Sequence, residues 1–358
     1  MRWSWYLPIL AWVTSLLLIP RDLATARDAR VSPEKISFSV VIKNKTFPYR
    51  INSVFVMPGE LLLFQVQATG KAGYTVQAAQ GELIRSGSRA WKWKAPYTSG
   101  IYRLRVSSDK SQEAMQLNAF VMLPAGHVRQ GYLKGYRIGA YPDRALRGQP
   151  MYRQPKGFIE VTSKTQDTFL TPHFQLKQFL CKQEGDFPKY VVLREELLLK
   201  LELILETLNA NGYPCPTLNV MSGYRTPHYN RSLGNAQYSR HVWGDAADIF
   251  IDEHPRDGDM DDLNQDGVID PQDAAVLYKL IESVEHKPAW RRLRGGLAIY
   301  RSNAFHGPFV HVDTRGQTVR WGVSPNLPEE TAELHENAEG EGTSLSATYD
   351  SPASPSLM

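Results

Sequence analysis

The stretch SRHVWGDAADIFID, residues 239–252, decides the fold of the second half of this chain. A histidine and two aspartates are grouped around small residues, and an apolar run follows directly. One interpretation is that Asp248 ends a buried element beside a solvated His241. The other is that His241 and Asp248 point at one metal ion. In that case Gly244 and Ala246 are small because larger residues would keep the two ligands from converging.

A later run, FHGPFVHVDTRG, supplies a third group. In a β-strand, Phe309, His311 and Asp313 share one face. A histidine that faces a cleft there completes a His-Asp-His set. Three protein ligands with an open fourth position are the pattern of a catalytic zinc site, and bound zinc polarises a substrate carbonyl. We therefore predict that His241, Asp248 and His311 bind zinc.

Residues 222–252, SGYRTPHYNRSLGNAQYSRHVWGDAADIFID, followed by HGPFVHVD, resemble the zinc D-alanyl-D-alanine carboxypeptidase family. That family includes D-Ala-D-Ala dipeptidases and lytic murein endopeptidases, and it shares its fold with the hedgehog signalling domain. Its motif is Ser-x-His-x-x-Gly-x-Ala-x-Asp, matched here by Ser239, His241, Gly244, Ala246 and Asp248. The resemblance covers about residues 156–323. It implies that His311 is the third zinc ligand, that Arg225 steadies the scissile carbonyl or its oxyanion, and that Ser239 lines the substrate pocket.

The general base is the point at which the chain departs from the family. Many members place an acidic residue three positions before the last ligand histidine, and here that position is Pro308. A hydrolase still needs a proton acceptor. By resemblance to some murein endopeptidases His306 is the first candidate, Asp313 on the strand face of His311 is the second, and Asp245 is the third. The competing interpretations are that His306 caps a turn and that Asp313 orients His311.

The resemblance implies a zinc peptidase that cleaves bonds involving D-amino acids in peptidoglycan stem peptides, as a D,D-carboxypeptidase or an endopeptidase. A free C-terminal carboxylate on the substrate requires a positive group, either Arg225 or the cluster of Arg291, Arg292 and Arg294. The alternative is a non-catalytic cell-wall-binding or scaffolding protein that zinc and calcium stabilise.

A second metal signal lies in an acidic insert, residues 252–285. Positions 1, 3, 5, 6, 7, 9 and 12 of a calcium loop are occupied by Asp262, Asn264, Asp266, Gly267, Val268, Asp270 and Asp273. Oxygen ligands from the side chains at 1, 3, 5 and 12, a glycine turn at 6 and the backbone carbonyl at 7 suit a hard cation. The loop resembles those of EF-hands and dockerins, and it predicts one Ca²⁺ site that pins the insert beside the zinc cleft.

The rest of the chain predicts an α+β domain, residues 156–323, on an antiparallel sheet, preceded by an immunoglobulin-like β-sandwich. The sandwich is expected at residues 33–123, where apolar and polar residues alternate in short runs. Residues 124–155 have no period and predict a linker or strap. A helix is expected within residues 193–212, with one apolar face formed by Leu197, Leu201, Ile204, Leu205 and Leu208.

The two ends of the chain predict export to the periplasm or cell envelope. Residues 1–26 read as a signal peptide: Arg2, an apolar core, and Ala24–Ala26 as a cleavage site. If this segment stays uncleaved, it is a membrane tether. Residues 325–358 hold seven acids and no Lys or Arg, which predicts a disordered tail and leaves a body more basic than the chain's net charge of +4. A basic body suits an anionic polymer such as cell wall, while the absence of zinc-finger or aromatic-basic motifs disfavours nucleic acid.

The chain has two cysteines, Cys181 and Cys215. In an oxidising compartment they form a disulfide, and otherwise they are two buried free thiols. The sequence leaves both alternatives open.

Overall fold

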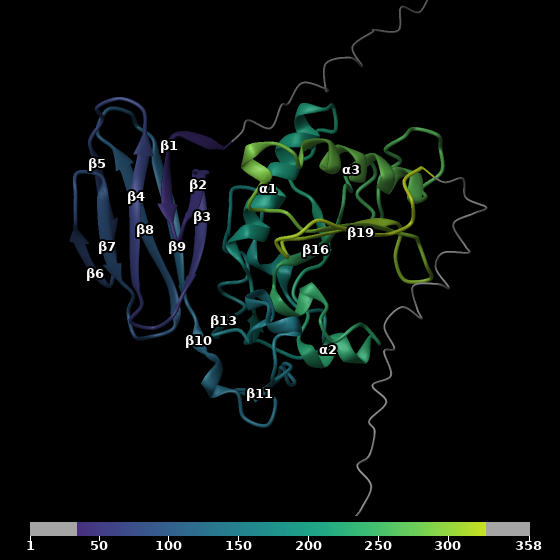
Figure 1. The fold of residues 1–358 in the computed structure, drawn as a ribbon, viewed down its shortest axis with the longest axis horizontal. Helices are drawn as coiled ribbons and strands as arrows, with labels where there is room; N and C mark the ends of the chain where they lie inside the picture. The colour runs from purple at the N-terminus through teal and green to yellow at the C-terminus, as the bar shows by residue number, and fades with distance from the viewer. Residues whose placement is uncertain (1–33, 327–358) are drawn as a thin grey trace, which may run out of the picture.

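The computed structural model describes residues 34–326, so the expected signal peptide and all but the first two residues of the expected acidic tail lie outside the described residues. The described chain forms two units (Figure 1). An all-β unit comes first, and a second unit combines helices with a five-stranded sheet. Within the described residues, no helix is long and apolar enough to cross a bilayer.

The first unit consists of two sheets that face each other across one core. The five-stranded sheet has the order β2-β1-β4-β7-β6 and the four-stranded sheet the order β3-β9-β8-β5. The strands are β1 (Lys35–Ile42), β2 (Lys45–Tyr49), β3 (Ile51–Val56), β4 (Leu61–Ala68), β5 (Tyr74–Ala78), β6 (Glu82–Arg85), β7 (Ala90–Lys94), β8 (Gly100–Ser108) and β9 (Ala114–Val121). In β4, Leu62, Phe64 and Val66 are buried and their neighbours are exposed, which is the alternation of a half-buried strand. The immunoglobulin-like type of this sandwich stays a prediction.

The segment between the units is ordered by short elements: β10 (Leu123–Pro124), η1 (Ala125–His127), β11 (Tyr132–Leu133), β12 (Tyr136–Arg137), η2 (Leu146–Gly148) and η3 (Pro150–Tyr152). Strand β10 pairs with β13 (Gly157–Val161) of the second unit. Tyr141 and Tyr152 pack edge-on against the indole of Trp243, with ring centroids 5.9 and 5.3 Å away. We call residues 124–155 the strap, because they close over the turn that carries His241.

The second unit is built on a five-stranded sheet of order β15-β16-β18-β17-β19. Its elements are η4 (Leu176–Phe179), β14 (Lys189–Val191), α1 (Glu195–Ala210), β15 (Asn219–Ser222), α2 (Pro227–Ser232), η5 (Arg240–Trp243), β16 (Ala246–Phe250), α3 (Pro271–Val284), η6 (Pro288–Trp290), β17 (Gly296–Tyr300), β18 (Phe309–Asp313) and β19 (Val319–Gly322). The prediction of an antiparallel sheet is wrong at one edge, because β17 and β19 run parallel. After β18 the chain turns through residues 314–318 to the far side of β17, so β19 runs opposite to β18 and along β17.

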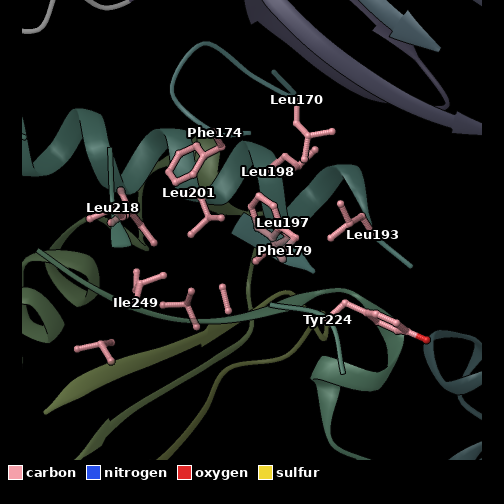
Figure 2. Close-up of a cluster of buried hydrophobic side chains, with 14 of the residues drawn as sticks. Leu170, Phe174, Phe179, Leu193, Leu197, Leu198, Leu201, Leu218, Tyr224 and Ile249 are labelled. Carbon is pink, nitrogen blue, oxygen red and sulfur yellow. The ribbon is translucent and has the colours of Figure 1, made fainter. Parts of the chain in front are cut away.

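Helix α1 forms where its apolar period predicted it, and all five of its predicted face residues are buried. Figure 2 shows Leu197, Leu198 and Leu201 of this helix gathered above Ile249 of β16. Successive side chains of a strand point to opposite faces. Because Ile249 and Val310 enter this core, their neighbours Asp248 and His311 face away from it. The helical core thus fixes which face of the sheet carries the chemistry.

The sandwich packs against α1 on the side of the helix that faces away from the five-stranded sheet (Figure 1). Leu199 of α1 is part of the buried sandwich core, and Leu203 packs against it. The carboxylate of Glu195 accepts a hydrogen bond from the backbone N–H of Phe55 at 3.1 Å and pairs with Lys45 at 2.9 Å. The sandwich therefore braces the helix that supports the sheet.

The two cysteines are free and buried in this structure. This matches the second of the two alternatives, and burial raises the pKa of the Cys215 thiol to about 12. A thiol with such a pKa is a poor nucleophile at neutral pH.

The pair formed by half-buried His173 and buried Glu202 makes the stability of this unit depend on pH. Glu202 of α1 is fully buried, and its carboxylate lies 2.7 Å from Nδ1 of His173. Burial alone would lower the pKa of His173, but the hydrogen bond and charge of Glu202 outweigh it and raise this pKa above its ordinary value. The folded state therefore favours the protonated ring. The pair stabilises the folded state fully at a pH below about 6.5, the pKa of His173 in the unfolded chain. This stabilisation is lost as the pH rises through the raised pKa of His173 in the folded protein.

We expect His173→Gln to lower the free energy of unfolding by about 1.5–3 kcal/mol at pH 5.5, and by progressively less as the pH rises. Urea unfolding of both proteins between pH 5.5 and 9 measures the difference. His286→Gln is the control, because His286 is exposed. A difference that stays constant with pH would contradict a charged pair.

Candidate metal centre

Three side chains converge on the open face of the sheet. Among the described residues, His241, Asp248 and His311 are the only group of three potential metal-binding side chains whose ligand atoms all lie within 4.8 Å of one another, and all three are buried. Nδ1 of His311 lies 2.8 Å from Oδ1 of Asp248 and 3.2 Å from Nε2 of His241. Asp248 and His311 are directly opposite in the β16–β18 pairing, so the sheet register itself brings these two together.

The two imidazoles are held by the nitrogens that face away from the centre. Nδ1–H of His241 donates to the backbone carbonyl of Gly223 at 2.7 Å, which leaves Nε2 facing Asp248. Nε2 of His311 lies 3.4 Å from Oδ2 of Asp313, which leaves Nδ1 facing Asp248. Fixing one ring nitrogen with a hydrogen bond is how proteins orient histidine ligands. Two histidines and a carboxylate presented in this way fit zinc.

Charge at the centre is arranged to keep Asp248 ionised. Burial alone would raise the pKa of Asp248, but His241 and His311 outweigh it and hold this pKa well below its ordinary value. Burial lowers the pKa of His241, so its ring favours the neutral form that binds metals. Arg225 donates from Nη2 to Oδ2 of Asp248 at 2.6 Å and from Nε to Ser222 at 2.8 Å. One carboxylate oxygen thus faces the histidines and the other is held by Arg225.

The three predicted base candidates lie in different places. The Asp313 carboxylate is buried between His311 and Arg315, and it accepts the backbone N–H of Gly296 at 2.8 Å. Burial opposes ionisation of Asp313, but His311 and Arg315 outweigh it and hold its pKa well below the ordinary value. This geometry suits a residue that orients His311. Asp245 is fully buried and paired with Arg240.

His306 lies on a turn at the rim of the site. Its Nδ1–H donates to the carbonyl of Gly307 at 2.8 Å, and Nε2 accepts from Nδ2 of Asn303 at 2.8 Å. Both ring nitrogens are therefore engaged in bracing the turn. Pro308, where the family acid was expected, is buried.

A cavity of about 970 Å³ opens onto the three ligands. Its lining includes the predicted substrate residues Ser239 and Arg225 and the rim residue His306. Sequence reasoning missed Lys182 and Asp259, which also line it, because neither belongs to a motif. Lys182 is exposed, and the protein atoms that surround part of its side chain lower the pKa of its ammonium. Within the described residues no hydrogen bond or ion pair involves its ammonium.

The arginine cluster does not take part in this cavity. Arg291 and Arg292 line a different cavity, of about 780 Å³, between α1, η6 and the sandwich. Arg292 donates to the backbone carbonyl of Asn44 in the sandwich. Of the two positive groups predicted for a substrate carboxylate, the structure places Arg225 at the metal centre and the cluster elsewhere.

Gly244, in the turn between the two motif ligands, has a steric reason to be glycine. Its φ is +70°, and a Cβ there would lie 2.0 Å from the carbonyl oxygen of Val192. The Gly244 carbonyl also accepts the N–H of Arg194 at 3.0 Å, which fixes the turn against the chain before α1. The contact with Val192 is a steric reason of its own, and the expectation that larger residues keep the ligands apart stays a prediction.

We expect Gly244→Ala to lower the free energy of unfolding by about 2–4 kcal/mol, because left-handed strain adds to a backbone clash. The matched control is Gly234→Ala, since Gly234 has a φ of +72° and a Cβ added there would meet no atom within 4 Å. The control should cost only about 1 kcal/mol. Equal losses in chemical denaturation would show that the Val192 contact is unimportant.

In the predicted calcium loop, carboxylate side chains accept hydrogen bonds from the backbone N–H groups of the loop itself. The Asp262 carboxylate accepts from the N–H groups of Gln265 and Gly267, at 2.7 and 2.8 Å. The Asp273 carboxylate accepts from Leu263 and Asp270, at 2.7 and 2.9 Å. Helix α3 begins at Pro271, so Asp273, the last position of the loop, lies in the first turn of the helix. The other predicted ligands, Asn264, Asp266 and Val268, lie on the exposed part of the loop.

Calcium binding stays a prediction. We expect 1 mM CaCl2 to raise the melting temperature of the protein, because binding adds about 2.7 kcal/mol of stability at a concentration 100 times Kd. Asp266→Ala should abolish the shift. Calorimetry in calcium and in magnesium measures it, and an unchanged melting temperature would contradict the prediction.

Comparison with known protein families matches the segment that contains His241 and Asp248. Residues 172–266, about a quarter of the chain, match the family model described as Peptidase M15. The match includes His241 and Asp248 and ends before His311. No curated protein matches the chain.

The similarity of this chain to solved structures is weak. A proposed alpha-galactosidase/melibiase from Bacteroides fragilis is 12% identical with a TM-score of 0.18, over 26% of this chain and 20% of that chain. The titin M3 domain is 13% identical with a TM-score of 0.16, over 24% of this chain and 97% of that one. The titin M1 domain is 13% identical with a TM-score of 0.15, over 20% and 87%. The second unit is thus similar to Peptidase M15 over residues 172–266, and two of the three residues of its His-Asp-His centre lie within that match.

Proposed function

We propose that this chain is an exported zinc peptidase that cleaves bonds involving D-amino acids in peptidoglycan stem peptides, as a D,D-carboxypeptidase or an endopeptidase. The observation that carries the proposal is the convergence of His241, Asp248 and His311 at a cavity large enough for a peptide. A cavity of this volume is in the range that small ligands occupy.

The residues around the centre have separable tasks. Zinc held by the three ligands would supply a Lewis acid that polarises the scissile carbonyl. The Arg225 guanidinium lines the cavity beside Asp248, so it is placed to face negative charge that develops on the substrate. Asp313 holds His311 in position through Nε2. Ser239 contributes a polar group to the cavity wall.

The alternative is a non-catalytic wall-binding or scaffolding protein. It is supported by the small number of carboxylates in the cavity that could accept a proton. Among the described residues, Asp248 and Asp259 are the two carboxylates that line the cavity. Asp248 is a predicted ligand held by Arg225, and both nitrogens of His306 are engaged. A protein with these ligands and no proton acceptor would bind the wall without cutting it.

One digest separates the two proposals. Purified sacculi are incubated with the protein, with the protein plus chelator, and after zinc is restored, and the soluble products are analysed by mass spectrometry. Release of D-Ala or of peptide fragments that stops with chelator and returns with zinc supports the peptidase and identifies the bond. Co-sedimentation with sacculi but no zinc-dependent products in any arm would favour the scaffold.

A further inference from the structure

The cavity has two electrically different ends, and the sheet register defines them. Strand β15 ends at Ser222, which pairs with Asp248, and the chain continues from there to Arg225 in the direction of the start of β16. At the other end, β18 is preceded by Gly307, in line with the residues that follow β16. Positive charge from Arg225 and Lys182 thus lies at one end of the cavity, and Asp259 lies at the other.

Asp259 is held at its end by a chain of backbone contacts. Its Oδ1 accepts the N–H of Gly307 at 3.2 Å. Its own N–H donates to Asp257 at 3.1 Å, and the N–H groups of Asp257 and Gly258 donate to Asp252 at 3.0 and 3.2 Å. Within the described residues Asp259 forms no ion pair. A carboxylate is therefore presented to the cavity with its charge uncompensated.

Phe305 comes two residues before Gly307, the residue that Asp259 contacts; it is 94% exposed and lines the same cavity. The turn that carries it is braced: Asn303 accepts the N–H of Phe305 at 2.8 Å, and the side chain of Asn303 is bound to His306 at 2.8 Å. Holding a phenyl ring in water on a rigid turn has no stabilising value for the fold. Aromatic side chains are common in the lining of ligand-binding cavities, so this ring is available to a ligand.

We propose that Asp259 and Phe305 form a subsite for a primary ammonium carried on an alkyl stem, such as the side chain of a diamino acid in a peptide. The carboxylate pairs with the ammonium, and the ring covers the methylene groups and faces the cation. The inference rests on the proposed function, whose substrate it narrows to stem peptides with a free side-chain amine.

The spacing sets where that residue lies in the peptide. Gly307 and His311 lie four positions apart in the sequence, roughly 13 Å along an extended chain. An alkyl stem of four carbons spans about 6 Å, which leaves about two residues of extended peptide between the amine-bearing residue and the bond at the metal centre. The positive end, with Arg225 and Lys182, then receives the carboxylate end of the peptide.

Binding to the metal-free protein tests the subsite without turnover. Isothermal titration compares the pentapeptide L-Ala-γ-D-Glu-L-Lys-D-Ala-D-Ala with the same peptide acetylated on its lysine amine. The wild-type protein should bind the free amine about tenfold more tightly, as an exposed ion pair plus a cation–π contact provides. Asp259→Asn, which keeps the acceptor for Gly307, should remove the preference. Phe305→Ala should weaken the binding of both peptides.

The matched control is Asp186→Asn, because Asp186 is exposed and lies outside the cavity lining. It should keep the tenfold preference. Equal affinity of the wild-type protein for both peptides, or a preference that survives in a folded Asp259→Asn protein, overturns the proposal. If the preference is present but the zinc-loaded protein cleaves neither peptide, the subsite stands and the peptidase proposal fails. If both peptides are cleaved equally with no preference in binding, the peptidase stands and the subsite fails.

Discussion

Replacing His311 with alanine should remove zinc from the protein. The wild-type chain is expected to retain about one zinc after gel filtration, and His311→Ala and His241→Ala are each expected to retain almost none. Loss of a hydrogen-bond partner of a ligand costs about 10–100-fold in metal affinity, so loss of a ligand should cost at least that. Metal analysis by mass spectrometry measures the result.

The geometry makes the two substitutions informative in different ways. His311 is set by sheet register opposite Asp248, whereas His241 is set by the η5 turn and the Gly223 carbonyl. Both variants should remain folded, because each ring is removed from the open face and not from the core beneath α1. His127→Ala is the control, since His127 is exposed and remote from the motif. Full zinc content in either ligand variant would mean that the three ligands are wrongly assigned.

The second large effect is expected at Asp245, the weakest of the base candidates. Arg240 and Asp245 are both fully buried, and Nε of Arg240 donates to Oδ1 of Asp245 at 3.0 Å. The guanidinium also lies 4.4 Å from the ring centroid of Tyr152, in the strap. Asp245→Asn leaves a buried cation without its counter-ion. We expect a loss of about 3–5 kcal/mol in the free energy of unfolding.

The double variant separates a structural role from a catalytic one. Arg240→Met combined with Asp245→Leu removes both charges from the interior, and replacing a buried pair with apolar groups is often neutral. The double variant should therefore be more stable than Asp245→Asn in urea unfolding. If Asp245→Asn instead keeps its stability and its zinc but loses hydrolysis of sacculi, Asp245 acts in the reaction and the assignment as a structural pair is wrong.

The site was more predictable than its surroundings, for a physical reason. His241 and Asp248 lie within one short motif, and the period of a strand placed His311 on a single face. The amphipathic period of α1 likewise identified its buried side. These features are local in sequence, so composition and spacing reveal them.

The features that escaped prediction depend on contacts between distant segments. Asp259 reaches the cavity because two loops, 48 residues apart in the chain, meet at Gly307. The parallel edge of the sheet depends on where β19 docks, and no local pattern encodes this.

The strap has a consequence for how the chain can be divided. Because β10 pairs with β13 and the strap tyrosines cover Trp243, a fragment that begins at residue 156 would expose the indole and leave one edge of β13 unpaired. A fragment limited to residues 172–266 would also lack the strand that carries His311. A piece that keeps these contacts therefore begins near Leu123, at the boundary between the predicted sandwich and what the sequence presents as a connector. A transplant of this centre into another protein would have to carry that connector along with the ligands.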